Sequence, residues 1–404
     1  LLLLGAVSHV FASIDSTGCP EVFLSRCRCG KSQYPKSPQL PDAPMKFLVN
    51  CTNSGFTDAS MLKLLPEQTE VLIFTGNKIG ELPINVFGNT VDYDDLTDLD
   101  FSNNAITFIP GKAFHRVYNV RTLILNHNDI EISERERPRM FYNFESLESL
   151  HLTNAFTEAV NSSYYLLSLD DIFYQSDLRL LIKLHLEQNE IYTIGKNASI
   201  FCQLPALQQL YLGDNRLFDL DFRLDCMPDI NYIDLQRNGI NELSVEAMNR
   251  IDEFSKKSQL TVELQKNPFM CDCYSQRFIR WLKNTNVTLR DADEYRCADG
   301  IPRSTIGKSL LTIEENKLKC PLEVGTHSRS GREGVTTEHV EGYSASTIGT
   351  LSFLLAFVSA VLLAVGFWHR NRISKTVTPY WDHVTRKVGY SGLANEELAK
   401  VVAV

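Results

Sequence analysis

Hydrophobic and polar positions through the middle of the chain follow one recurring pattern. The clearest unit has apolar residues at Leu96, Leu99, Phe101 and Ile106, and an amide at Asn104. Apolar residues two apart are typical of a short strand that turns alternate side chains toward a core. Seven such units and a closing one follow one another, with these residues in the amide position: Asn77, Asn104, Asn128, Ala155, Asn189, Asn215, Asn238 and Asn267.

A unit of this length cannot bury its apolar side alone, so the units must stack on one another. The pattern is the leucine-rich repeat. It predicts an α/β repeat solenoid with a curved parallel sheet, in which stacked asparagine amides bond to backbone groups where each coil turns. The longest interval, from Ala155 to Asn189, contains an irregular stretch at Thr157–Leu180 that we expect to bulge from the edge.

Two apolar runs lie outside the repeats. The run at 1–12 is uncharged and ends in Ala12, which predicts a partial signal peptide. The run at 347–368 has no charged residue, ends in Trp368 and is followed by the basic cluster 369–372. About 20 apolar residues cross a bilayer as a helix, and the basic flank is expected inside. We therefore predict a type I single-pass protein of the plasma membrane, with its N-terminal ectodomain outside.

These features divide the chain into seven segments. In order, they are a partial signal peptide (1–12), an N-terminal cysteine cap (13–65), the repeats (66–258), a closing repeat with a C-terminal cysteine cap (259–320), a flexible stalk (321–346), a transmembrane helix (347–368) and a cytoplasmic tail (369–404). The tail ends in Val402 and Val404, the hydrophobic carboxyl end that PDZ domains add to a sheet edge. A cytoplasmic PDZ protein is therefore one predicted partner.

Composition narrows the class of function. Hydrophobic residues make up 44% and charged residues 22% of the chain, which excludes a disordered protein, and the formal charge of -9 argues against nucleic-acid binding. No hydrolase, metalloprotease, P-loop or kinase motif is present, and the histidines are scattered. We predict a binding module, not an enzyme, with no catalytic residue, no metal and no cofactor.

All ten cysteines precede the predicted transmembrane helix. Zinc binding is the rival interpretation of their Cys-x-Cys spacings, but an oxidising compartment favours disulfides. Cys202 and Cys226 occupy similar positions in adjacent repeats, about one coil apart, so we expect them to pair. Four Asn-x-Ser/Thr sequons predict a glycosylated ectodomain, and they begin at Asn50, Asn161, Asn197 and Asn286.

In the repeat frame, the residues that flank the central strand leucine project from the concave face of the sheet. Because strands stack ~4.8 Å apart, several of these residues form one aromatic and polar strip. The strip contains His151, Lys183, His185, Tyr211, Tyr232 and Asp234. Tyrosine is favoured at protein interfaces, so the strip predicts a site for an extracellular protein ligand or co-receptor. An ordinary solvated sheet face is the alternative, and the two histidines suggest pH-dependent binding.

The cysteine clusters resemble the terminal caps of extracellular leucine-rich-repeat proteins. One cluster precedes the repeats with a Cys19-Pro20 start, and the other follows them. Four cysteines in a cap allow three pairings, so the residues alone leave the connectivity open. The resemblance implies the pairs Cys19–Cys29, Cys27–Cys51, Cys271–Cys297 and Cys273–Cys320.

The C-terminal cap is more specific. Its segments 267–273, 279–283 and 295–297 resemble the trophoblast glycoprotein family of oncofetal antigens, and the likeness covers roughly residues 19–370. This resemblance implies a plasma-membrane glycoprotein that modulates Wnt signalling and affects adhesion and migration. Two other interpretations remain open, a cell-adhesion or synaptic-organiser protein and a pattern-recognition co-receptor.

Overall fold

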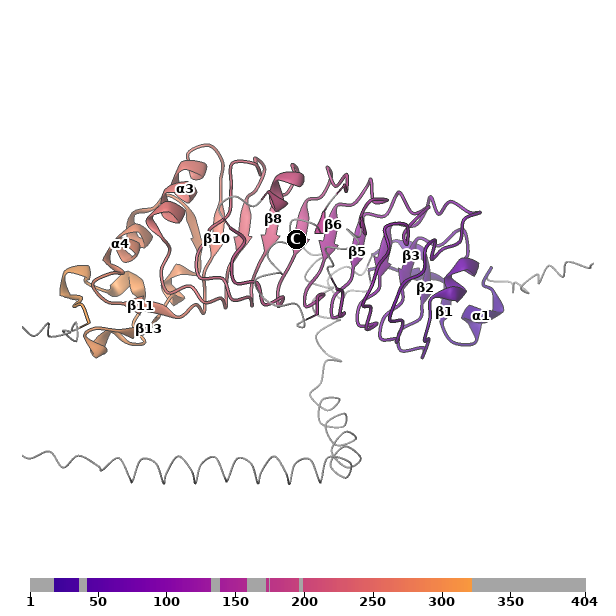
Figure 1. Cartoon of the computed structure of the whole chain (residues 1–404), viewed down its shortest axis with the longest axis horizontal. Coiled ribbons are helices and arrows are strands. Elements are labelled where there is room, and N and C mark those ends of the chain that lie inside the picture. The colour runs from indigo at the N-terminus through magenta and orange to yellow at the C-terminus, as the bar shows by residue number, and fades with distance from the viewer. Residues whose placement is uncertain are drawn as a thin grey trace, which may run out of the picture. The chain divides into compact units, whose positions relative to one another are not determined.

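The computed structural model describes residues 18–35, 42–131, 139–157, 172–173, 175–195 and 199–321. Within these ranges, eleven strands form one sheet in the order β1-β2-β3-β4-β5-β6-β7-β8-β9-β10-β12, and β11 pairs with β13. Strands β2 to β10 pair in parallel with their neighbours and β12 joins β10 in parallel, whereas β1 and β2 are antiparallel. Figure 1 shows these strands side by side along the solenoid, which confirms the predicted curved parallel sheet.

The repeat strands are only three residues long. The strands are β1 (Arg28–Gln33), β2 (Met45–Asn50), β3 (Val71–Ile73), β4 (Asp98–Asp100), β5 (Thr122–Ile124), β6 (Ser149–His151), β7 (Lys183–His185), β8 (Gln209–Tyr211), β9 (Tyr232–Asp234), β10 (Thr261–Glu263), β11 (Phe269–Cys271), β12 (Thr288–Arg290) and β13 (Cys297–Gly300). The α-helices are α1 (Glu21–Leu24), α3 (Val245–Ser255) and α4 (Gln276–Asn284). The 3-10 helices are η1 (Ser60–Leu64), η3 (Ile200–Gln203), η4 (Ala292–Glu294), η5 (Arg303–Thr305), η6 (Leu310–Thr312) and η7 (Glu315–Lys317).

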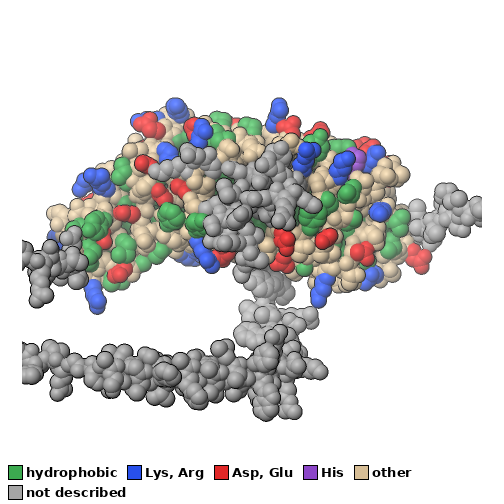
Figure 2. Space-filling model, in the orientation of Figure 1, with side chains coloured by type: hydrophobic (Ala, Val, Ile, Leu, Met, Phe, Trp, Pro, Cys, Tyr) green, Lys and Arg blue, Asp and Glu red, His purple; other side chains and the backbone are tan. Residues whose placement is uncertain are grey.

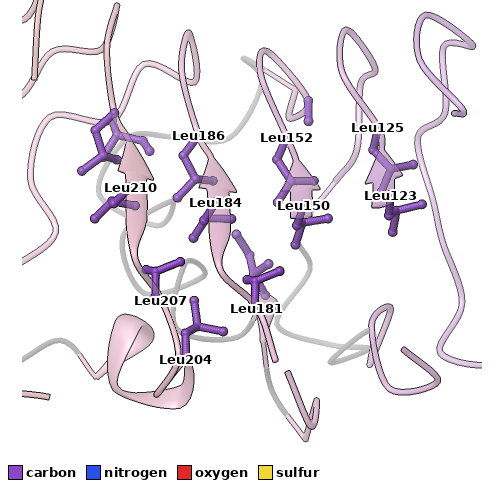
Figure 3. Packing of buried hydrophobic residues seen from close by; sticks show 14 of the residues in the cluster. Leu123, Leu125, Leu150, Leu152, Leu181, Leu184, Leu186, Leu204, Leu207 and Leu210 are labelled. Atoms are coloured by element: carbon purple, nitrogen blue, oxygen red, sulfur yellow. The ribbon is translucent and has the colours of Figure 1, made fainter. Parts of the chain in front are cut away.

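Leucines at the repeat positions form a continuous core. Leu150, Leu184 and Leu210 are each the middle residue of a strand, are aligned by the strand register and are fully buried. Figure 3 shows a second row, with Leu152 and Leu186 two residues further along, on the same side of the coils. Full burial of a leucine contributes about 1.5–3 kcal/mol, and most of it here is burial against the next coil. The core therefore exists only because coils stack.

Phenylalanines extend the core in the first repeats, where Phe74 and Phe101 occupy the repeat position that Leu152 and Leu186 hold in later repeats. The rings of Phe56 and Phe74 are stacked with centroids 5.5 Å apart, and Phe74 contacts Phe101 at 5.8 Å. The row continues from Phe101 to Phe114 at 5.8 Å and on to Phe144 at 5.1 Å. Large rings reach from one coil to the next, so this row joins consecutive repeats.

The asparagine ladder is present as predicted. Nδ2 of Asn104 donates to the carbonyl oxygens of Phe74 (2.5 Å) and Phe101 (2.8 Å). Its Oδ1 accepts from the backbone N–H of Asn77 (2.9 Å), in the preceding coil. The same pattern recurs at the other asparagine positions, and the ladder resumes after Ala155, whose N–H donates to Oδ1 of Asn189 (3.0 Å). Each amide thereby satisfies buried backbone groups of two coils.

The cysteines pair as the sequence and the cap resemblance led us to expect. The structure contains disulfides Cys19–Cys29, Cys27–Cys51, Cys202–Cys226, Cys271–Cys297 and Cys273–Cys320. No cysteine is left free, so the Cys-x-Cys spacings belong to disulfides. Cys202–Cys226 joins neighbouring coils outside the caps, with the two Cα atoms 4.9 Å apart.

The C-terminal cap closes the core through the partly buried Trp281 and the fully buried Tyr295. Nε1–H of Trp281 in α4 donates to the carboxylate of Asp252 in α3, 2.9 Å from both oxygens. The hydroxyl of Tyr295 accepts from the backbone N–H of Leu264 (3.1 Å) and donates to the carbonyl of Arg290 (3.0 Å). The cap thus covers the last apolar edge and bonds to the last repeat.

Several predicted segments lie outside the described residues. These are the signal peptide, the transmembrane helix and the cytoplasmic tail, and nearly all of the stalk. Among the residues that the structure describes, no helix is long and apolar enough to cross a membrane. The irregular stretch 157–180 is described only in part, so the expected bulge stays a prediction, although side chains of its later portion belong to the core. Phe173 and Leu178 are buried, and Phe173 lies 6.0 Å from the ring of Phe141.

We predict that Asn104→Ala lowers the free energy of unfolding by about 2–4 kcal/mol, because it removes three buried hydrogen bonds and leaves backbone groups unpaired. Chemical denaturation would measure the loss. The matched control is Asn119→Ala, since the exposed Asn119 also donates to a carbonyl, that of Asp94 (2.9 Å). An equal effect from both substitutions would contradict the role given to the ladder.

Candidate binding surface on the concave sheet

The strand register brings the predicted strip together. His151 of β6, His185 of β7 and Tyr211 of β8 are direct cross-strand neighbours, and Asp234 of β9 continues the row. In the parallel row, Lys183 is followed by Gln209 and then Tyr232. Two rows of side chains therefore run across four adjacent strands.

Three rings of the strip form a nearly parallel stack. The rings of His151 and His185 have centroids 4.2 Å apart and are tilted by 8°, and those of His185 and Tyr211 are 4.1 Å apart and tilted by 5°. Tyr232 contacts Tyr211 at 5.3 Å with its ring tilted by 53°. The first two spacings approach the distance between neighbouring strands, so the sheet itself imposes the stack. We call these four rings the ring ladder.

The first histidine of the ring ladder is held neutral. His151 is 4% exposed, and its Nε2 lies 2.9 Å from Oγ of Ser149. Burial lowers its pKa well below the usual histidine value, and His185 and Lys183 lower the pKa further because a second positive charge would be close to them. The ring therefore acts as a hydrogen-bonding aromatic surface and not as a cation near neutral pH.

The second histidine is bonded to an acid that our sequence interpretation did not select. Nδ1 of His185 lies 2.9 Å from Oε1 of Glu187, and Thr153 Oγ1 donates to Oε2 of the same carboxylate (2.9 Å). Glu187 and Thr153 occupy the third outward position of their repeats, two residues beyond the strand histidines. The repeat frame alone could have found them, because this position also projects from the sheet.

The other end of the strip is acidic. Burial raises the pKa of Asp234 to about 6, although this carboxylate accepts hydrogen bonds from the backbone and side chain of Gln236 (2.8 and 3.1 Å). Tyr232 donates to Oε2 of Glu263 at 2.5 Å, and Arg290 lies 3.6 Å from the same oxygen. Elsewhere, acidic and basic side chains are interspersed over the part of the face in Figure 2 that is not grey. The strip thus has neutral aromatic rings at its β6 end and carboxylates at its β9 end.

Exposure differs among the residues of the strip. His151, Asp234 and His185 are buried, with 4%, 5% and 9% of their surface exposed. Lys183, Tyr211 and Tyr232 are half-buried and present the accessible part of the strip. Ring-on-ring packing therefore leaves the inner members of the strip little open surface.

The remaining predicted sites lie elsewhere. Asn50 belongs to β2, and Asn286 follows α4. Asn161, Asn197 and the carboxyl end with Val402 and Val404 lie outside the described residues. Among the described residues, no group of three or more His, Cys, Asp or Glu side chains is arranged to hold a metal ion.

Comparison with known proteins agrees with the fold. The leucine-rich-repeat family model matches residues 94–155. Mouse trophoblast glycoprotein is 24% identical over 406 residues, which cover 96% of this chain and 88% of the relative. The crystal structure of human 5T4, also called Wnt-activated inhibitory factor 1 or trophoblast glycoprotein, aligns with a TM-score of 0.59 and 22% identity, and covers 73% of this chain and 98% of that one. This chain is a leucine-rich-repeat protein that resembles trophoblast glycoprotein.

A further leucine-rich-repeat relative is a receptor. Human Toll-like receptor 5 is 29% identical over 250 residues, which are 60% of this chain and 25% of the receptor. The likeness to trophoblast glycoprotein is the more complete of the two, because it covers most of both chains.

We predict that His151→Gln flattens the pH dependence of the free energy of unfolding below about pH 6.5. The folded histidine has a lowered pKa, so the unfolded state binds more protons in this window and native stability falls as the pH falls. Denaturation at several pH values would measure the slope. The control is His115→Gln, because His115 lies outside the ring ladder and contacts Tyr118. An unchanged slope in the His151 variant would contradict the buried neutral ring.

Asp234→Asn should change the pH dependence of stability in the opposite direction from His151→Gln. The folded carboxyl has a raised pKa of about 6, so native stability falls as the pH rises from about 4 to 7. We expect the stability of the variant relative to the parent to rise by about 2 kcal/mol between pH 4.5 and 7.5. Urea denaturation of both proteins at the two pH values would measure this. Asp177→Asn, at an exposed carboxylate paired with Arg179, should show no such rise.

Proposed function

We propose that this chain is a cell-surface glycoprotein, anchored by one membrane-spanning helix, that binds an extracellular protein and modulates signalling. The binding surface is the ring ladder with the adjoining Lys183 and Asp234. The protein acts by recognition and carries out no chemistry. The predicted PDZ-type carboxyl end suits the tail to recruit a cytoplasmic partner.

The observation that carries this proposal is the ring ladder itself. An aromatic row of four side chains crosses four strands of the sheet, and Tyr211 and Tyr232 at its end are half-buried. Rings fixed by neighbouring rings lose little conformational entropy when a partner covers them, which favours them as interface anchors. The hydrogen-bonded Glu187 and Glu263 beside them supply polar contacts that orient a partner.

The relatives support Wnt signalling as the pathway. Human 5T4 is also called Wnt-activated inhibitory factor 1, and the trophoblast glycoproteins match this chain over most of its length. We therefore place the proposed activity in modulation of Wnt signals at the plasma membrane. Adhesion between cells is the alternative outcome of the experiment below, and a co-receptor role is favoured only by the partial likeness to Toll-like receptor 5.

A Wnt-responsive reporter in cells that express the full chain tests this function. We expect the chain to change the reporter signal, and a version ending after Lys375 to change it equally, because the ectodomain is proposed to act. The double variant Tyr211→Ala/Tyr232→Ala should need at least about thirtyfold more surface protein for the same effect, since even one anchor tyrosine contributes ~2 kcal/mol.

Tyr274→Ala is the matched control, because Tyr274 is 64% exposed and lies in the C-terminal cap. Surface staining must show equal amounts of all versions. No reporter change from the parent would overturn the Wnt assignment, and aggregation of the expressing cells would then support adhesion. A change that survives the double variant would place the binding surface elsewhere.

A further inference from the structure

Asn286 lies on rigid backbone at the end of the sheet, between α4 and β12. The N–H of Thr285 donates to the carbonyl of Trp281 (2.8 Å), and its hydroxyl donates to Oδ1 of Asp252 (2.8 Å). Val287, on the other side, is buried in the core. Asn286 and Thr288 are themselves exposed, so the Asn-x-Thr acceptor faces solvent from a fixed position.

A polar groove adjoins this acceptor. It lies between the end of α3 and the end of α4, has a volume of 290 Å³, and Asn286 forms part of its wall. All of its lining residues are polar, among them Asn249, Glu253, Lys256 and Asn284. The volume is close to that of the smallest ligand sites, ~300 Å³. A groove without apolar lining residues suits a ligand rich in hydroxyl and amide groups.

The groove offers unused hydrogen-bonding groups. The carboxylate of Asp252 at its base is already held by Trp281 and Thr285. Nδ2 of Asn284 donates to the carbonyl of Arg280 (2.7 Å), and within the part of the chain that the structure describes its Oδ1 accepts no hydrogen bond. The exposed Asn249 makes no side-chain hydrogen bond to any described residue. Such amides both donate to and accept from sugar hydroxyl and acetamido groups.

We infer that Asn286 carries an N-linked glycan whose first N-acetylglucosamine lies in the groove between α3 and α4 and bridges the two helices. This inference rests on the proposed function, because glycosylation requires the ectodomain to enter the secretory pathway. A sugar that binds only the folded cap stabilises it, as any ligand of the native state does. The glycan is therefore a structural part of the C-terminal cap.

Asn50 provides a contrast within the same chain. Its Oδ1 accepts from both the N–H (3.0 Å) and the hydroxyl (2.7 Å) of Thr52. It lies in β2 beside Ile73 of β3, within the sheet and away from the groove between α3 and α4. A sugar at Asn50 would not lie in this groove, so its removal should not alter the stability of the C-terminal cap.

The test begins with glycopeptide mass spectrometry of the full chain from mammalian cells that make only high-mannose glycans. The stability measurement then uses the full chain with Asn50, Asn161 and Asn197 changed to Gln, which keeps a single acceptor. Endoglycosidase H, which leaves the first sugar, should shift the melting temperature by less than about 1 °C, whereas complete removal by peptide-N-glycosidase should lower it by about 3 °C. Asn286→Asp should melt like the fully deglycosylated chain.

Asn249→Ala/Asn284→Ala should abolish the difference between the two enzymes while leaving the acceptor occupied, and Asn119→Ala should preserve it. Occupied Asn286 with equal melting temperatures after both enzymes would overturn the bound sugar. Glycans at other sequons but none at Asn286 would overturn this inference and leave the proposed function standing. A chain with no glycan at any sequon would contradict both.

Discussion

Each coil of this solenoid leaves the sheet through a turn whose backbone groups have no strand partner, and the buried asparagines supply the missing bonds. Asn104 shows how one amide joins two coils, because it donates to a carbonyl of each coil and accepts from the N–H of Asn77 in the preceding one. A buried peptide group without a partner costs about 1–3 kcal/mol, so a ladder of such amides fixes the coil spacing more tightly than apolar contact alone. The leucine and phenylalanine rows can stack only at the spacing that this ladder sets.

The same spacing creates the surface on the other side of the sheet. Residues at one repeat position must lie one strand apart, so His151, His185 and Tyr211 are brought to about 4 Å from one another whatever their own preferences. Planar rings tolerate that spacing face to face, whereas a buried charge does not, which is why His151 stays neutral and the pKa of Asp234 is raised. The ring ladder is thus a consequence of repeat geometry, and its chemistry follows from how closely the sheet packs its members.

Repeat periodicity made most of the fold predictable. The register of β6 to β9, the ladder at Asn189 and the pairing of Cys202 with Cys226 all follow from counting positions within a unit. Counting repeat positions did not predict how deeply His151 is buried, because its exposure depends on which side chains surround its ring. Counting also did not predict two side-chain hydrogen bonds, those from Tyr232 to Glu263 and from Trp281 to Asp252. The first joins different repeats, and the second involves α4, which is not part of the repeat pattern. The burial of Phe173 was also not predicted, because the irregular stretch around it has no repeat pattern from which to count positions.

We propose that a partner covers the tyrosine end of the ring ladder. Photo-crosslinking on living cells tests this most directly, with a photoreactive phenylalanine analogue introduced at Tyr232 in one version of the full chain and at Tyr274 in another. Tyr232 is a half-buried member of the ring ladder, whereas Tyr274 is exposed in the C-terminal cap. We expect a specific crosslinked protein from position 232 and none from position 274. The same crosslink from position 274 only, or from neither position in cells that respond to the protein, would contradict this proposal.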